Sequence, residues 1–137
     1  MNTALPIMVV VGDKWSARCV ITGGAIKKAI FSTTVEKEGS GSLPSVSGIT
    51  VSTLGDKITI NCAVEITDYT LTSNTVTFIL PSQITARIKP GNYSYNISVI
   101  EANTENTNDE QVITPVYTNA FNVYARVNAI NPTPTNN

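Results

Sequence analysis

The sequence predicts an antiparallel all-β sandwich, and two features of its 137 residues support that prediction. Apolar and polar residues alternate with a period of two along most of the chain, which is the pattern of a strand with one buried face. Short segments of this kind are separated by Gly, Pro, Asn and Asp, the residues that favour turns. Because no long segment has the spacing of an amphipathic helix, we expect about eight or nine short strands in a sandwich.

The clearest strand is 57–67, in which Ile58, Ile60 and Cys62 alternate with Thr59 and Asn61. The same reasoning predicts the other strands. In chain order the expected strands are 5–11, 14–22, 25–37, 49–54, 57–67, 75–80, 92–102, 111–117 and 119–129. The Gly-, Ser- and Pro-rich segment 38–48 and the polar segment 103–110 are predicted to be loops. One domain over 1–130 would then be followed by a flexible Pro/Thr/Asn tail over 131–137, which has little to bury.

The segment 81–89 differs from its neighbours. Ser82 is a candidate cap for a single helical turn, which would place Ile84 and Ile88 on one side at a spacing of four. Pro90-Gly91 would then turn the chain into the next strand.

The strand periodicity also predicts a core. Its expected members are Trp15, Cys19, Ile58, Ile60, Cys62, Val64, Phe78, Tyr95, Ile97, Val99 and Phe121. Two of these are the chain's only cysteines, which face inward on different strands. Their separation is short for the inter-sheet bridge of sandwich domains, and buried Cys packs well as a small hydrophobe. We therefore expect two free thiols.

Charge is sparse and scattered. The chain has nine Lys and Arg and ten Asp and Glu, a net charge of −1, and charged residues make up 14% of it, against about 25% in typical domains. Nucleic-acid binding needs clustered Lys and Arg, so it is not expected. No apolar run is long enough to span a membrane, and 1–11 lacks the features of a secretory signal. A weakly charged surface is one that neighbouring proteins could cover.

The residues needed for most catalytic chemistry are missing. The chain has no His, which removes the commonest general base and metal ligand. Neither a phosphate-binding Gly loop nor a calcium-loop motif occurs. Loop acids such as Glu36, Glu38 and Glu101 are expected to be solvated. We therefore predict no catalytic residues, no cofactor and no metal site.

The run from Ile84 to Val99 contains Pro90-Gly91-Asn92-Tyr93, in which an apolar plug, a forced turn and a returning tyrosine hydroxyl follow one another. It resembles the tyrosine corner of immunoglobulin-like (Ig-like) and fibronectin type III domains, with the Tyr one residue nearer to Pro-Gly. The resemblance implies an Ig-like sandwich.

Three runs, Gly12-Asp13-Lys14-Trp15, Phe78-Ile79-Leu80-Pro81 and Pro90 to Ile97, are together similar to the N-terminal Ig-like domain of phage baseplate upper proteins and related tail and head-fibre proteins. The similarity extends over about residues 10–127. The Asp-Leu-Thr-Gly element of that family is replaced here by Ile26-Lys27-Lys28-Ala29, and no fibre segment follows the domain.

This resemblance implies a non-enzymatic virion structural protein, part of a tail, baseplate or capsid, present in several copies and assembled in the host cytoplasm. The alternative is an adhesion module of fibronectin type III-like fold that binds a carbohydrate or protein ligand, for which Tyr69, Tyr117 and Tyr124 are the candidate exposed aromatics. Contacts with neighbours are expected at the apolar start, 5–11, which is a candidate edge strand, and at the tail.

Overall fold

The computed structural model describes residues 6–22, 26–39, 41–66, 73–102 and 110–126, with the backbone alone at 102 and 110–117. This part of the chain contains eight strands and one short helix. In order they are β1 (Ile7–Val10), β2 (Trp15–Thr22), β3 (Ile26–Glu36), β4 (Ile49–Leu54), β5 (Lys57–Glu65), β6 (Ser73–Leu80), α1 (Ser82–Thr85), β7 (Gly91–Ala102) and β8 (Glu110–Tyr124). The predicted strands all appear, and the two expected after residue 110 are one continuous strand, β8. None of the described helices is long and apolar enough to cross a membrane.

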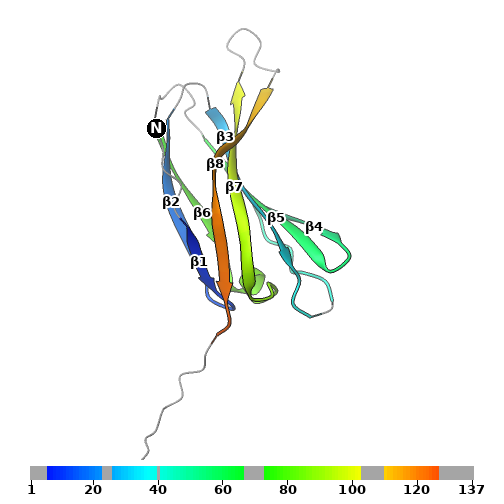
Figure 1. Ribbon diagram of the computed structural model, residues 1–137. Helices are drawn as coiled ribbons and strands as arrows, with labels where there is room; N and C mark the ends of the chain where they lie inside the picture. The colour runs from blue at the N-terminus through cyan, green and yellow to red at the C-terminus, as the bar shows by residue number, and fades with distance from the viewer. Residues whose placement is uncertain (1–5, 23–25, 40, 67–72, 103–109, 127–137) are drawn as a thin grey trace, which may run out of the picture.

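The strands form two sheets that face each other. One has six strands in the order β1-β8-β7-β3-β5-β4, and the other pairs β2 with β6. Figure 1 shows β2 and β6 beside the large sheet, with the β4–β5 hairpin extending away on the opposite side. The order β3-β7-β8 across from β2 and β6 follows that of the C, F and G strands across from B and E in immunoglobulin sandwiches. The predicted β-sandwich is therefore confirmed.

One pairing departs from the antiparallel expectation. β1 runs parallel to β8, with Ile7 opposite Phe121 and Val10 opposite Tyr124. The other strand pairs are antiparallel. A parallel pair cannot be closed by a short turn, and here the two partners come from opposite ends of the chain.

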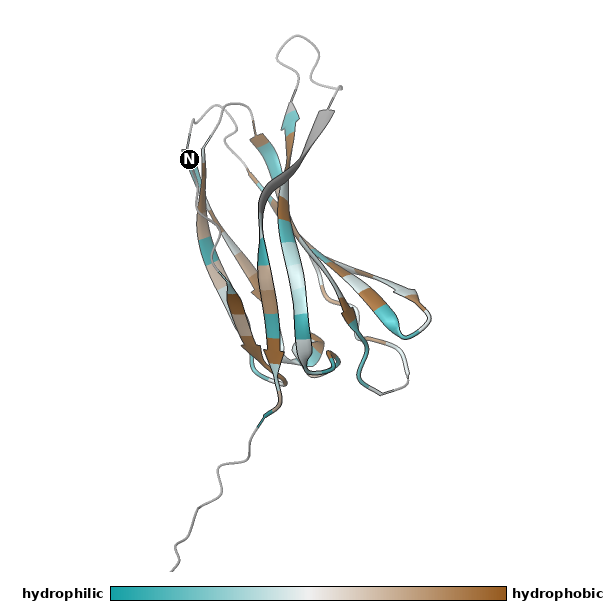
Figure 2. Ribbon diagram, viewed as in Figure 1, coloured by the Kyte–Doolittle hydropathy of each residue, from teal (hydrophilic) through white to brown (hydrophobic). Residues whose placement is uncertain are grey.

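An aromatic cluster occupies the centre of the core. Phe31 is fully buried, and its ring contacts those of Trp15, Phe78, Tyr95 and Phe121 at centroid distances of 5.2 to 5.9 Å. These five side chains come from β2, β3, β6, β7 and β8, so the cluster joins both sheets. Hydrophobic and hydrophilic residues alternate along the same strands in Figure 2.

Most of the predicted core is confirmed, and three members are only half-buried. Buried as expected are Ile58, Ile60, Cys62, Phe78, Tyr95, Ile97, Val99 and Phe121. Trp15, Cys19 and Val64 pack against the core but remain partly exposed. Trp15 and Cys19 belong to β2, in the layer of only two strands, and Val64 lies one residue before the end of β5.

The predicted corner is present. The Tyr93 hydroxyl donates to the Lys89 carbonyl at 2.6 Å, and Ile84 and Ile88, which precede it in the chain, are both fully buried. A Cβ atom at Gly91 would lie 3.0 Å from the Tyr93 hydroxyl oxygen, so the ring lies directly over this glycine. This residue order thus makes a tyrosine corner, although the Tyr is nearer to Pro-Gly than usual.

The expected capping role of Ser82 is wrong. Pro81 holds the N-cap position of α1, and no side chain caps the helix. Pro81 has an extended backbone, and its carbonyl already accepts hydrogen bonds from the Ile84 and Thr85 amides. Ser82 is therefore the first helical residue.

The buried Thr85 hydroxyl joins the corner to the turn between β1 and β2. It donates to the Asp13 carbonyl at 2.8 Å. The Arg87 guanidinium holds the predicted 38–48 loop by donating to the carbonyls of Gly41 and Ser42.

An irregularity interrupts the β7–β8 ladder. Ile97 lies opposite Tyr117, but Val99 lies opposite Ile113, so Ser98 faces the three residues 114–116. Pro115 falls within this bulge, and proline is tolerated there because it has no amide hydrogen to donate to a ladder.

Candidate interaction surfaces

The outer face of the six-stranded sheet carries hydroxyl and amide side chains. One row crosses five strands through successive cross-strand pairs and consists of Thr118, Asn96, Ser32, Asn61 and Thr50. The next pair along β3 and β5 is Thr34 with Thr59, whose hydroxyl oxygens are 2.9 Å apart. This face can form hydrogen bonds with a partner, but it has little charge with which to attract one from a distance.

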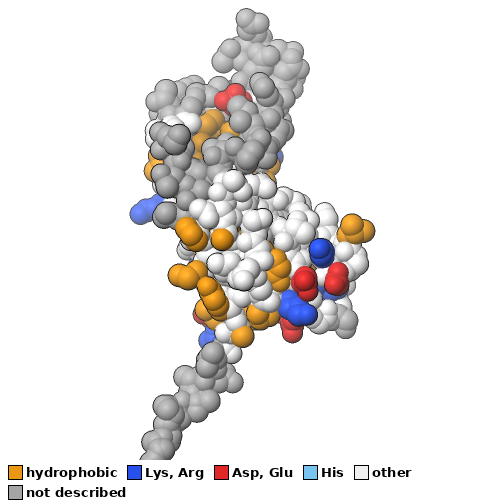
Figure 3. Space-filling view, viewed as in Figure 1, with side chains coloured by type: hydrophobic (Ala, Val, Ile, Leu, Met, Phe, Trp, Pro, Cys, Tyr) orange, Lys and Arg blue, Asp and Glu red, His pale blue; other side chains and the backbone are white. Residues whose placement is uncertain are grey.

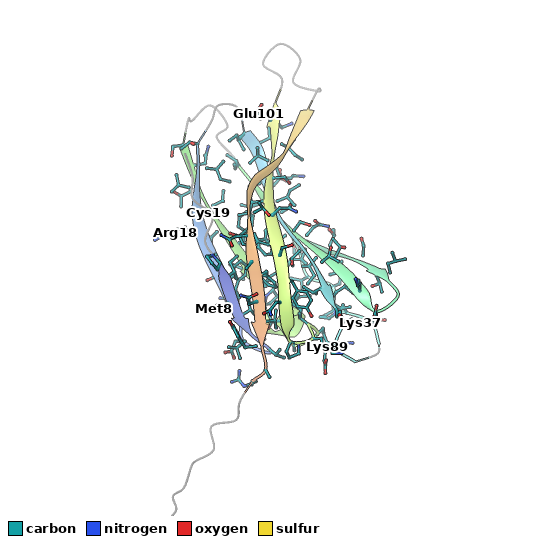
Figure 4. All side chains as sticks on the ribbon, viewed as in Figure 1. Met8, Arg18, Cys19, Lys37, Lys89 and Glu101 are labelled. Carbon is teal, nitrogen blue, oxygen red and sulfur yellow. The ribbon has the colours of Figure 1, made fainter. Side chains whose placement is uncertain are left out.

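Charged side chains lie at the two ends of this face. In the β3–β5 ladder, Lys28 is opposite Glu65 at one end, with a 3.1 Å ion pair, and Glu36 is opposite Lys57 at the other. The three outward pairs between them are uncharged. In Figure 4, Lys37 and Lys89 lie at the lower end of the sheet and Glu101 at the far end of β7. An interface core is normally depleted of charge, so the uncharged region between these ends is the part best suited to being covered.

An apolar patch lies at one edge of the same face. Met8 and Val10 point outward from β1 and are 69% and 36% exposed, and Tyr124 of β8, directly opposite Val10, is 47% exposed. We call these three residues the β1 patch. Figure 3 shows hydrophobic side chains gathered on the β1 side, a largely uncharged centre, and acidic and basic side chains near β5.

β1 is also the last strand of its sheet. In the described part of the chain it pairs only with β8, so its other side is an open edge. The prediction of an edge strand at the apolar start is thus confirmed for Ile7–Val10; Leu5 lies outside the described residues. Edge strands usually carry Lys, Pro or a bulge that discourages pairing. β1 has none of these within its four residues, although Pro6 precedes it.

The cysteines do not form a reactive site. Both are free, as predicted. Burial raises the pKa of the Cys19 thiol to about 11. Burial also raises the pKa of Cys62, whose thiol donates to the Ile79 carbonyl at 3.6 Å. Thiols of this kind are poor nucleophiles at neutral pH. Cys62 is on β5, whereas the disulfide of antibody domains joins the two strands that correspond to β2 and β7 of this chain.

The acids do not gather into a site among the described residues, where no three His, Cys, Asp or Glu side chains could hold a metal ion together. Glu36 lies 3.8 Å from the ammonium of Lys89. Asp13 forms an ion pair with Arg126 just beyond the β1 patch. The acids at 68, 105 and 109 lie outside the described residues, and so does the tail over 131–137.

Of the three candidate aromatics, Tyr124 is exposed on the sheet face. Tyr69 lies outside the described residues, as does the side chain of Tyr117. Sequence reasoning did not identify Met8 and Val10 as surface residues, because the apolar run Ile7–Val11 has no alternation that distinguishes an inner from an outer face.

No protein-family model matches this chain, and no curated protein matches it either.

Proposed function

We propose that this protein is a non-enzymatic assembly module that docks onto another protein through the β1 patch and the open edge beside it. One observation carries the proposal: Met8, Val10 and Tyr124 are exposed next to a strand that lacks a pairing partner on one side. An added strand can take its affinity from backbone hydrogen bonds and its specificity from neighbouring side chains. The adjoining uncharged polar face would enlarge such a contact without burying charges.

The setting that we propose is a bacteriophage particle, with the protein as a tail, baseplate or capsid-attached component present in several copies. Support for this setting comes from the three sequence runs that resemble Ig-like domains of phage structural proteins. The corner formed by Tyr93 and Lys89 agrees with the third run. Repeated weak contacts suffice in such a particle, because a symmetric lattice raises the effective concentration of each contact.

The test is incorporation into purified particles. Mass spectrometry of intact virions should detect the wild-type protein, and its absence would refute the phage setting. Met8→Lys should reduce incorporation, because it places a charge in the β1 patch. The matched control is Ile79→Lys, which makes the same kind of change at an exposed residue of β6 in the other sheet. Equal incorporation of the two folded variants would refute the role of the patch.

A second candidate function is adhesion to a carbohydrate or protein ligand. The observation that favours it is the exposed Tyr124 ring near the cross-strand pair of Asn92 and Asn122, because an aromatic face beside amide groups suits a sugar. Glycan-array binding that Tyr124→Ala abolishes and Tyr124→Phe retains would favour this function. If Met8→Lys reduces incorporation into particles and the wild-type protein binds no glycan, the assembly function is favoured.

A further inference from the structure

The six-stranded sheet has a second open edge, formed by β4. In the described part of the chain its only strand partner is β5, and at its start the Ile49 amide donates to the carbonyl of Val46 in the preceding loop at 3.1 Å. It contains six residues, ITVSTL, without a charge, a proline or a shift in register. Leu54 at its end is 85% exposed, and the hairpin extends away from the rest of the domain in Figure 1. Beyond Ile49, β4 thus lacks the features by which natural edge strands avoid pairing with other chains.

The hydrogen-bond pattern shows which backbone groups face this edge. The Ala63 amide donates to the Gly48 carbonyl at 2.9 Å. Hydrogen-bonded pairs alternate along an antiparallel ladder. Thr50 and Ser52 therefore bond to β5, whereas Val51 and Thr53 direct their amides and carbonyls to the open side.

We propose that β4 pairs in antiparallel orientation with β4 of a second copy of this chain, about a two-fold axis perpendicular to the sheet. The inference deepens the proposed assembly role, because it names the contact between copies. It uses the edge opposite the β1 patch, so one molecule can form both contacts.

Strand direction favours this pairing over a head-to-tail one. Successive antiparallel pairs from β8 through β7, β3 and β5 make β4 run in the same direction as β8, and β1 is parallel to β8. Joining β4 of one copy to β1 of the next by repeating the sheet would therefore create a parallel pair and an open-ended array. A β4–β4 pair is antiparallel, which is slightly more stable, and it closes as a two-fold dimer, the commonest symmetry.

Side chains and charge are compatible with the two-fold axis. A two-fold perpendicular to the sheet keeps outward residues opposite outward residues. In the register centred on Ser52, each exposed Leu54 lies opposite Thr50 of the second copy, and Val51 exchanges backbone bonds with Thr53. No like charges meet, because β4 has none. The contact is narrower than a standard interface of about 1,600 Å², so we expect a weak dimer that a multi-copy particle would reinforce.

The experiment uses the purified full chain. Sedimentation velocity from about 1 μM to about 1 mM covers the affinities expected of a weak interface. Amide hydrogen exchange at the two ends of this range should show concentration-dependent protection at Val51 and Thr53. Ser52→Lys places two like charges near each other across the axis, and we expect it to weaken dimerisation at least about tenfold. Its matched control is Ser94→Lys, the same change at an exposed outward residue in the interior of the same sheet.

A backbone variant tests the same pairing without charge. Thr53→Pro removes an amide that we place on the open side, so the folded monomer should remain while the dimer is lost. A protein that is monomeric at every concentration overturns the inference, and so does equal dimerisation of the two lysine variants. Protection at Met8 to Val10 instead of β4, or protection of β4 only when another protein is added, also overturns it. In each of these cases particle incorporation through the β1 patch is unaffected, so the proposed function is judged separately.

Discussion

Replacing Tyr93 with Phe removes one hydroxyl from the corner that the sequence predicts most distinctively. That hydroxyl donates to the Lys89 carbonyl at 2.6 Å. A neutral hydrogen bond contributes about 0.5–1.5 kcal/mol net to folding. The acceptor belongs to an exposed residue, so water can replace the lost donor, and we expect a loss near 1 kcal/mol. For a domain of this size that loss lowers the melting temperature by roughly 3–5 °C.

Urea unfolding at neutral pH measures this loss directly. The midpoint should fall while the slope of the transition stays unchanged, because the buried area is the same. Tyr124→Phe is the matched control, because the described residues offer its hydroxyl no hydrogen bond and it is exposed. If the two variants lose equal stability, the corner bond does not stabilise the fold and our reasoning about this motif is wrong.

The pH dependence provides a separate check on the surroundings of the Tyr93 hydroxyl. Burial raises the pKa of the Tyr93 phenol above its ordinary value. A raised pKa in the folded state means that the neutral phenol adds to the stability of the fold. This contribution is fully present below the unfolded pKa of about 10 and is lost as the pH rises through the folded pKa. The difference in unfolding free energy between wild type and Tyr93→Phe should therefore be constant near neutrality and shrink above about pH 10. A difference that grows at alkaline pH would contradict the direction of the shift.

Three other outcomes follow from the packing. Ile60→Ala should cost about 2–5 kcal/mol because the side chain is fully buried, whereas Leu54→Ala should change stability by less than about 0.5 kcal/mol; equal denaturation midpoints would refute the assigned register. Thr85→Val should cost about 0.5–1.5 kcal/mol in thermal unfolding, because it removes the hydrogen bond from the buried Thr85 hydroxyl to the carbonyl of the exposed Asp13 in the β1–β2 turn; wild-type stability would contradict this. Iodoacetamide at neutral pH should modify Cys19 and Cys62 slowly in the folded protein and both fully after denaturation; rapid native modification would show that the thiols are accessible and reactive.

Local pattern was sufficient where the opposing layer covers one face of a strand. Most of β5 is such a case, because Ile58, Ile60 and Cys62 are buried as their alternation predicts, and only Val64 near its end is half-buried. The corner was equally predictable, since proline, glycine and tyrosine act over a few neighbouring residues. The position of the helix start was not, because the backbone of Pro81, and no side chain, satisfies the first amides of α1.

Long-range pairing explains what the sequence could not show. Nothing near Ile7–Val10 indicates that its partner is β8, and an uninterrupted apolar run hides which side chains are exposed. The degree of burial also depends on the opposite layer. Trp15 and Cys19 alternate correctly but are half-buried, because the layer that carries them has only two strands. The edge position of β4 is likewise a property of the sheet, since its own residues read as an ordinary strand.

The two open edges lead to a prediction about assembly. Because β1 and β4 lie at opposite ends of one sheet, a dimer joined through β4 would present a β1 patch at each of its far ends. Two patches on one rigid body can bind a particle together, which raises their apparent affinity through effective concentration.

Ser52→Lys leaves both patches intact but separates the copies, so we expect reduced occupancy on particles at limiting protein and normal occupancy at saturation. Met8→Lys should lower occupancy at limiting protein and at saturation alike. Titration of particles lacking the protein with each purified variant measures this. Identical binding curves for Ser52→Lys and wild type would show that β4 pairing plays no part in assembly, whatever its strength in solution.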